Sequence, residues 1–197
     1  YRAHYVTRAV EEVLLQKKIP YTIYSGVQFF GRMEIKDALS YLRMIVYKDD
    51  LSFLRTANTP KRNLGKRRMA YLKEFAEENH CSLYQALLQS LDEPVMKGTR
   101  AKEYADLIER YSSEYEGKGI SDLLSSILDE SGYEELLRTE GSQERLDNLA
   151  ELKQSIYEFE TSCGEETDLV QYLSHVALFS NADAAVQPDK VKLMTVH

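Results

Sequence analysis

The most distinctive chemistry in this sequence is a group of cations beside a glycine turn. The stretch between Lys61 and Lys73 contains six Lys or Arg side chains and no carboxylate. Gly65 stands directly before a predicted helix, where free backbone N–H groups and the positive end of the helix dipole favour an anion. This arrangement predicts a phosphate-binding site, within the stretch from Thr59 to Arg68, formed by Thr59, Lys61, Arg62, Asn63, Leu64, Gly65, Lys66 and Arg67.

The same residues allow two interpretations. Basic side chains would release counterions from a nucleic-acid duplex, which is the main source of sequence-independent affinity. Asn63 suits a tight turn, because Asn tolerates a positive φ better than other non-glycine residues. The alternative is an ordinary solvated turn between two helices that is basic without binding anything. The residues alone leave both interpretations open.

Other candidate chemistry is weaker. Glu34 and Asp37 could form a catalytic carboxylate pair, but acids in a first helical turn more often favour the helix dipole, and Arg32 could pair with them. The histidines and the two cysteines lack the spacing of metal ligands, so no metal site is expected. The sequence contains neither G-x-x-x-x-G-K-[ST] nor G-x-S-x-G. We therefore expect no catalytic residue and no cofactor site in this chain.

The elements that must position the basic cluster are predicted to be almost entirely helical. Alternating aromatic and β-branched residues predict strands at 21–24 and 191–196. Between them, apolar residues at helical spacing predict a mainly α region, which fits a helical insertion between two pieces of a sheet domain. The predicted helices cover 5–17, 32–47, a short segment through Leu51 and Leu54, 66–79, 82–91, 100–115, 121–128, 143–159 and 168–179.

Charge is distributed unevenly along the 197 residues. Residues 1–80 carry fifteen Lys and Arg against nine Asp and Glu, whereas the remainder carries ten against twenty-three. The net charge of −7 thus permits a local anion site on an acidic body. No apolar run approaches a membrane span, and neither a leader nor a dense set of cysteines is present, so we expect a cytoplasmic protein without a membrane partner. The chain begins without Met and is expected to be a piece of a longer protein.

Four stretches carry a resemblance to a known family. Residues 21–43, YTIYSGVQFFGRMEIKDALSYLR, resemble Y-x-I-x-G-G-x-x-F-F-x-R-x-E-I-K-D-x-L-x-Y-L-R of superfamily 1 DNA helicases of the UvrD/PcrA/Rep type. Residues 58–65, NTPKRNLG, resemble the N-x-P-x-R-G-I-G loop of that family, with Asn63 in place of its first glycine. Residues 145–152, RLDNLAEL, resemble R-x-x-N-x-x-E-L, and residues 191–197, VKLMTVH, resemble the start of L-M-T-x-H-x-A-K-G-L-E.

The resemblance implies a place in a larger motor. Such helicases have two RecA-like lobes, 1A and 2A, each with an accessory insertion, 1B and 2B. Residues 1–34 would then be a piece of lobe 2A, residues 35–186 the helical 2B insertion, and residues 187–197 the return to 2A. Hinges would lie near Gly31 and at 181–188. Thr195 and His197 would sit near the single strand, in a motif that the chain carries only in part.

Two functional hypotheses of different classes remain, the first implied by the resemblance and the second by the acidic helices. In the first, the chain belongs to an ATP-dependent, 3′-to-5′ DNA helicase of DNA repair or plasmid replication. The loop at 59–68 holds duplex DNA through its backbone without sequence specificity, and the 2B region regulates unwinding. ATP and magnesium would bind elsewhere in the parent protein, so this chain alone would neither hydrolyse ATP nor unwind DNA. In the second, the acidic helices form a protein-interaction and autoinhibitory module. Pairing of the Lys61–Lys73 cations with Glu74, Glu77 and Glu78 would favour the second.

Overall fold

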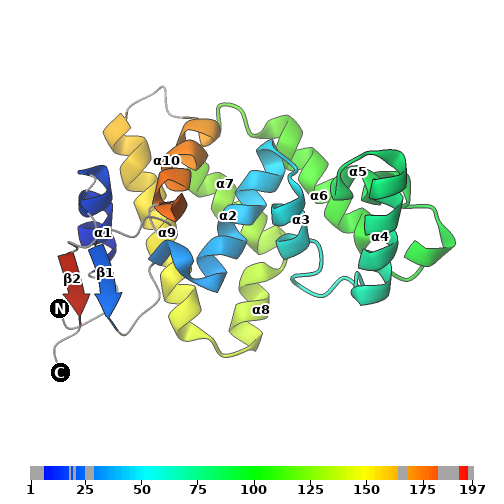
Figure 1. Ribbon diagram of the computed structural model, residues 1–197, viewed down its shortest axis with the longest axis horizontal. Helices are drawn as coiled ribbons and strands as arrows, with labels where there is room; N and C mark the ends of the chain where they lie inside the picture. Colours follow the sequence, from blue (N-terminus) through cyan, green and yellow to red (C-terminus); the bar gives the residue numbers. More distant parts are fainter. Residues whose placement is uncertain are drawn as a thin grey trace.

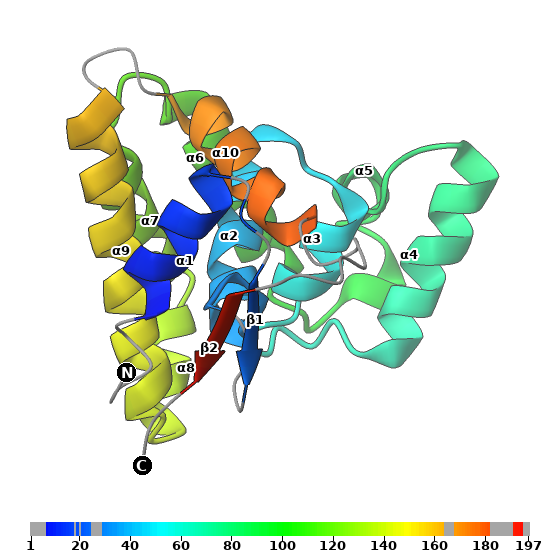
Figure 2. The ribbon, with the colours of Figure 1, turned by 60° about the vertical axis from the view of Figure 1, so that its left-hand side comes forward.

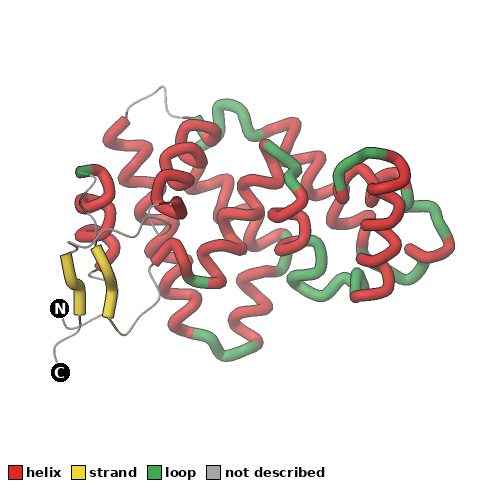
Figure 3. The backbone as a smooth tube through the Cα atoms, viewed as in Figure 1, coloured by secondary structure: helices red, strands yellow, loops and turns green. Residues whose placement is uncertain are grey.

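The computed structural model describes residues 7–17, 19, 21–24, 29–163, 168–181 and 191–194, and these residues form a mainly α structure (Figures 1 and 3). The sequence prediction of a mainly α fold is therefore confirmed. The elements in chain order are α1 (Thr7–Gln16), β1 (Tyr21–Tyr24), the 3-10 turn η2 (Phe29–Gly31), α2 (Met33–Val46), α3 (Asp50–Thr56), α4 (Lys66–Asn79), α5 (Leu83–Gln89), the 3-10 turn η3 (Pro94–Met96), α6 (Ala101–Glu114), α7 (Ile120–Glu130), α8 (Tyr133–Thr139), α9 (Gln143–Cys163), α10 (Leu169–Asn181) and β2 (Val191–Met194).

Helix α2 is the centre of the helical body. Its sequence is apolar on most of its circumference, and such a helix is stable only when other elements cover it on all sides. It contacts α3, α6, α7, α9 and α10, and its side chains Ile35, Tyr41, Leu42 and Met44 are all completely or almost completely buried. Figure 1 shows α2 running through the middle of the body with these helices around it.

The two ends of the described chain meet in a small parallel sheet. Tyr21 pairs with Val191, and the register continues to Tyr24 opposite Met194. In Figure 1, this pair lies with α1 at one end of the molecule, whereas α4 and α5 lie toward the other end. Figure 2, with the first end turned forward, shows the two strands side by side. The helical body thus leaves from one strand and returns beside it.

Two buried polar contacts join α2 to the later helices. Asn148 on α9 donates from Nδ2 to Glu34 Oε1 at 2.6 Å and accepts a hydrogen bond from Arg32 Nη1. Asp37 accepts from Arg55 Nη1 at 2.5 Å and from the Tyr133 hydroxyl at 3.0 Å. The carboxylates of Glu34 and Asp37 are therefore held inside the helical body by its own polar side chains. Arg32 reaches Glu34 through Asn148.

The sequence patterns predicted most helices to within a few residues, including α4 at 66–79. They did not predict α8, a seven-residue helix between two glycines with positive φ, Gly132 and Gly141. Its two buried side chains, Tyr133 and Leu137, supply only one turn of apolar spacing, which is too short a pattern to distinguish from a loop. Within the described part of the chain, no helix combines the length and apolar character needed to cross a bilayer.

Helix α4 ends in a strained position that offers a stability test. His80, its exposed C-cap residue, adopts φ 49° and ψ 45°, a left-handed conformation that costs non-glycine residues free energy. We expect His80→Gly to raise the free energy of unfolding by about 1 kcal/mol, measured by urea denaturation. Asn79→Gly is the matched control, because a glycine inside the helix should lower stability. A destabilised His80→Gly protein would show that the imidazole makes a compensating contact.

Candidate nucleic-acid interface

The loop at 57–65 joins α3 to α4 and carries the predicted phosphate site (Figure 3). Its last residue, Gly65, is the N-cap of α4 and makes no side-chain capping hydrogen bond. The first helical hydrogen bond runs from Met69 N–H to Gly65 O, so the N–H groups of Lys66, Arg67 and Arg68 have no acceptor within the helix. A Cβ placed on Gly65 would meet no heavy atom within 4 Å. This helix end is open to an incoming group.

The predicted site residues alternate between outside and inside along the loop. Thr59 is half-buried, Arg62 and Leu64 are buried at 4% and 2% exposure, and the remaining predicted residues of the loop, Lys61, Asn63, Gly65, Lys66 and Arg67, are exposed. Asn63 adopts the expected positive φ of 61°. Thr195 and His197, the other two predicted contacts, lie outside the described residues.

Arg62 lies inside the loop, and the expectation that it adds surface charge for a phosphate is not met. Its Nη1 donates to the main-chain oxygens of Thr56 at 2.9 Å and Pro60 at 3.2 Å. Its Nη2 donates to Ser131 O at 3.0 Å and to the Tyr41 hydroxyl at 3.2 Å. The sequence could not reveal this, because a buried and an exposed arginine in a basic loop give the same local pattern.

Two buried tyrosines complete the surroundings of Arg62. The guanidinium carbon lies 5.1 Å from the centre of the Tyr104 ring, and the Tyr41 hydroxyl donates to Thr59 O at 2.6 Å. Burial raises the pKa of the Tyr41 phenol, although the Arg62 charge opposes this, and burial also raises the pKa of Tyr104. Both phenols are therefore neutral at physiological pH and serve as hydrogen-bonding groups around the cation.

The Asn58 side chain fixes the main chain of the loop. Its Oδ1 accepts hydrogen bonds from the N–H groups of Arg62 at 2.9 Å and Leu64 at 3.0 Å. These two amides are therefore not available to a ligand. Of the predicted phosphate cradle, the part that remains open is the start of α4.

A second loop, which the sequence analysis did not single out, is fastened to the first. Arg68 donates from Nε to Val95 O at 2.8 Å and from Nη2 to Lys97 O at 3.0 Å, and Asn63 Nδ2 donates to Gly98 O at 2.9 Å. This places the exposed Lys97 beside the basic loop. The only sequence signal for this second loop is the Lys97-Gly98 pair after η3. Its position next to the 57–65 loop depends on contacts between residues about thirty positions apart, which a local pattern does not show.

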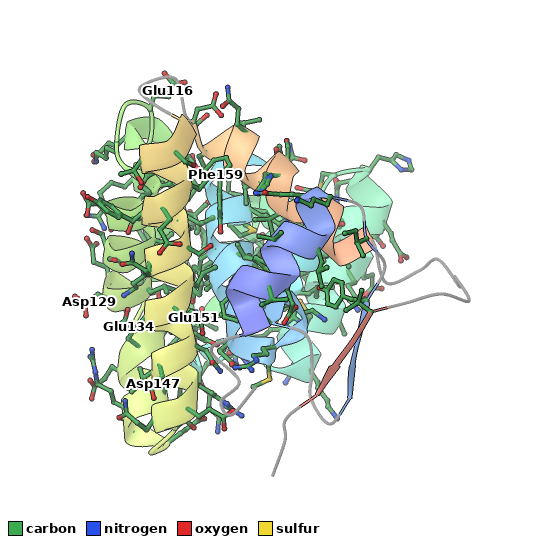
Figure 4. The ribbon with its side chains drawn as sticks, turned by 90° about the vertical axis from the view of Figure 1, so that its left-hand side faces the viewer. Glu116, Asp129, Glu134, Asp147, Glu151 and Phe159 are labelled. Atoms are coloured by element: carbon green, nitrogen blue, oxygen red, sulfur yellow. The ribbon has the colours of Figure 1, made fainter. Side chains whose placement is uncertain are left out.

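The cations of this surface differ from those of the acidic helices in their pairing. Among the described residues, no carboxylate lies within ion-pair distance of Lys61, Lys66, Arg67, Lys73 or Lys97, and Glu74, Glu77 and Glu78 do not pair with them. Five cations in or beside the later helices have acidic partners: Arg110 with Glu130, Lys118 with Glu114, Arg138 with Glu134, Arg145 with Glu140, and Lys153 with Glu134. Lys102 on α6 has no such partner among the described residues. Figure 4 shows Asp129, Glu134, Asp147 and Glu151 on the part of the body formed by α7–α9, and Glu116 on the loop that leads into α7.

The charge at the start of α4 is unfavourable for the isolated helix. Its first turn contains Lys66, Arg67 and Arg68 and no acid, next to the positive end of the dipole. Each such cation lowers the stability of the helix by roughly 0.3–1 kcal/mol, and a bound anion would offset that loss.

No group of three His, Cys, Asp or Glu side chains in the described part of the chain is arranged to hold a metal ion.

Comparison with known proteins agrees with the resemblance. A family model described as the UvrD-like helicase C-terminal domain matches residues 1–197. The chain is 35% identical over 208 residues to DNA helicase II of Escherichia coli, covering 100% of this chain and 29% of that protein. It is 34% identical over 206 residues to the ATP-dependent DNA helicase PcrA of Staphylococcus epidermidis, covering 100% of this chain and 28% of that protein. The chain therefore spans less than a third of the length of these relatives.

Proposed function

This chain belongs to the UvrD-like helicase C-terminal domain family, and we propose that it is the part of an ATP-dependent DNA helicase that holds duplex DNA and regulates its unwinding. The parent protein would move 3′-to-5′ along a single strand in DNA repair, with ATP and magnesium bound outside this chain. Residues 1–34 and 187–197 would belong to lobe 2A and residues 35–186 to the 2B insertion. The parallel pairing of β1 with β2, on either side of the helical body, supports this division.

The observation that carries the proposal is the set of unpaired cations at the uncapped start of α4. Lys61, Lys66 and Arg67 are exposed without an acidic partner, and the free N–H groups of the first turn lie beside them. Cations and backbone donors of this kind bind phosphates irrespective of base sequence. Their lack of pairing with Glu74, Glu77 and Glu78 favours duplex contact over the protein-interaction module.

Fluorescence anisotropy with a labelled DNA hairpin, over a series of salt concentrations, tests the proposal. We expect weak binding that does not depend on base sequence and whose affinity falls steeply with salt. Duplex should bind more tightly than a single strand of the same length. Absence of binding at low salt would contradict a duplex grip in this chain and favour the protein-interaction alternative.

A substitution at Gly65 tests whether a phosphate approaches the backbone. We expect Gly65→Ala to weaken duplex binding about tenfold, the equivalent of one hydrogen bond to a charged group of about 1.5 kcal/mol, because the new methyl group would occupy the open space before α4. The fold should tolerate it, because Gly65 has φ −72°. Gly119→Ala is the matched control, at the N-cap of α7 with φ −60°. Unchanged affinity in Gly65→Ala would exclude close backbone contact.

We further propose that the chain alone does not hydrolyse ATP. The sequence lacks the glycine-rich phosphate loop with its lysine, which nucleotide hydrolysis in such motors requires. A phosphate-release assay with the purified chain and single-stranded DNA should give no turnover above background. Turnover that survives a second purification step would contradict this.

A further inference from the structure

The basic loop contains one cation that points inward, and its surroundings suggest a different role from that of its neighbours. Arg62 is 4% exposed, whereas Lys61 and Asn63 on either side are exposed. A side chain that is covered by the protein cannot lie against a phosphate on the surface. The role of Arg62 must therefore follow from what its guanidinium holds.

The guanidinium connects three separate segments of the chain. Within its own loop it binds the carbonyl oxygens of Thr56 and Pro60, so it closes the loop onto the end of α3. From α2 it binds the Tyr41 hydroxyl, and from the turn between α7 and α8 it binds Ser131 O, 69 residues away. One side chain thereby links the loop to both α2 and the turn between α7 and α8, beside the hydrogen bond from the Tyr41 hydroxyl to Thr59 O.

The chemistry of these partners requires an arginine. All the hydrogen-bond acceptors of Arg62 are carbonyl or hydroxyl oxygens, and no carboxylate among the described residues lies within ion-pair distance of it. A guanidinium presents its donors in a rigid planar fork that reaches several acceptors at once and stacks on an aromatic ring such as Tyr104. A lysine has the same charge on one flexible nitrogen and cannot reproduce this geometry.

The main chain at Arg62 is fixed as well. Its N–H is held by Asn58, and its carbonyl accepts from the N–H of Arg100 at 3.0 Å, at the start of α6. With the side chain buried and both backbone groups engaged, the neighbouring Lys61 and Asn63 have to face outward. The inward position of Arg62 therefore sets the outward positions of the exposed residues of the loop.

We propose that Arg62 is a positioning residue for the duplex grip: it does not touch DNA, and its buried guanidinium holds the 57–65 loop in the shape that presents Lys61, Asn63 and the start of α4 together. The effect of Arg62 on DNA binding rests on the proposed function. Its effect on the shape of the 57–65 loop, which we call its internal role, can be measured separately. It differs from the prediction made from the sequence, in which Arg62 is itself one of the phosphate-binding residues.

Arg62→Lys distinguishes a positioning role from direct phosphate binding, because it keeps the positive charge and removes the planar set of guanidinium donors. We expect hairpin affinity to fall at least about tenfold at a temperature where the protein is fully folded, a larger loss than in Lys61→Ala. Lys61→Ala removes an exposed charge and should lower the slope of log affinity against log salt by about 0.9. Leu152→Ala, a buried substitution in α9, controls for general loss of stability and should bind within about twofold of the unsubstituted chain.

Hydrogen exchange measures the loop directly. In Arg62→Lys, we expect the Arg62 and Leu64 amides, which bond to Asn58, to exchange faster relative to the α2 core amides, with no such local change in Leu152→Ala. Wild-type affinity in Arg62→Lys, or unchanged protection of these amides, would overturn the proposal. If the unsubstituted chain binds no DNA, the proposed function fails, and faster exchange in Arg62→Lys would still support the internal role of Arg62.

Discussion

Reversing two charges at the start of α4 should abolish most duplex binding while leaving the protein at least as stable. In Lys66→Glu/Arg67→Glu, two phosphate contacts are lost, so the salt slope should fall by about 1.8 and the affinity at 0.1 M salt roughly 60-fold, before the repulsion of the new carboxylates. The same carboxylates would lie at the positive end of the helix dipole, where an acid stabilises by roughly 0.3–1 kcal/mol. Binding and stability should therefore change in opposite directions.

Anisotropy with a DNA hairpin measures the first effect, and urea denaturation measures the second. Lys118→Glu is the matched control, because Lys118 follows the far end of α6, whereas the basic loop contacts Arg100 at the near end. A 14-residue helix separates the two by about 20 Å. If the double variant bound like the control, the grip would not lie at the start of α4. If it lost both binding and stability, the loss of binding would reflect unfolding.

Replacing Asp37 by Ala should cause a large loss of stability, because this carboxylate is buried and hydrogen-bonded to two other helices. The Asp37 carboxylate is 9% exposed and accepts hydrogen bonds from Arg55 and from the Tyr133 hydroxyl. Asp37→Ala leaves the Tyr133 hydroxyl buried without this acceptor and removes the partner of Arg55. We expect a loss of about 3 kcal/mol, at the low end for a broken buried ion pair because Arg55 is 38% exposed and can turn toward water.

Urea denaturation of Asp37→Ala beside Lys36→Ala gives the comparison. Lys36 is the exposed neighbour of Asp37 on the same helix, and its replacement should change stability by less than about 0.5 kcal/mol. A loss below about 1 kcal/mol in Asp37→Ala would mean that the carboxylate is not required for the packing of α2 against α8.

Several features of the fold could be predicted because they depend on local order. The apolar spacing of α2, α4 and α6 is a property of consecutive residues, and so is the alternation of Tyr21–Tyr24. The short α8 could not be predicted, because two buried side chains one turn apart make no pattern. Its Tyr133 hydroxyl donates to Asp37, 96 residues earlier, and this contact exists only in the folded chain.

The candidate site likewise combines features that the local sequence predicts with features that only the folded chain shows. The amino-acid sequence by itself determined that a basic loop with a glycine precedes α4, that Asn63 can take a positive φ, and that the chain resembles a helicase family. Only the tertiary structure decided that Arg62 lies inside and that Lys97 lies beside the loop. Tyr41, Tyr104 and Ser131 surround Arg62, and they lie on segments that meet only on folding. Burial is a property of all neighbours in space, whereas charge belongs to the residue itself.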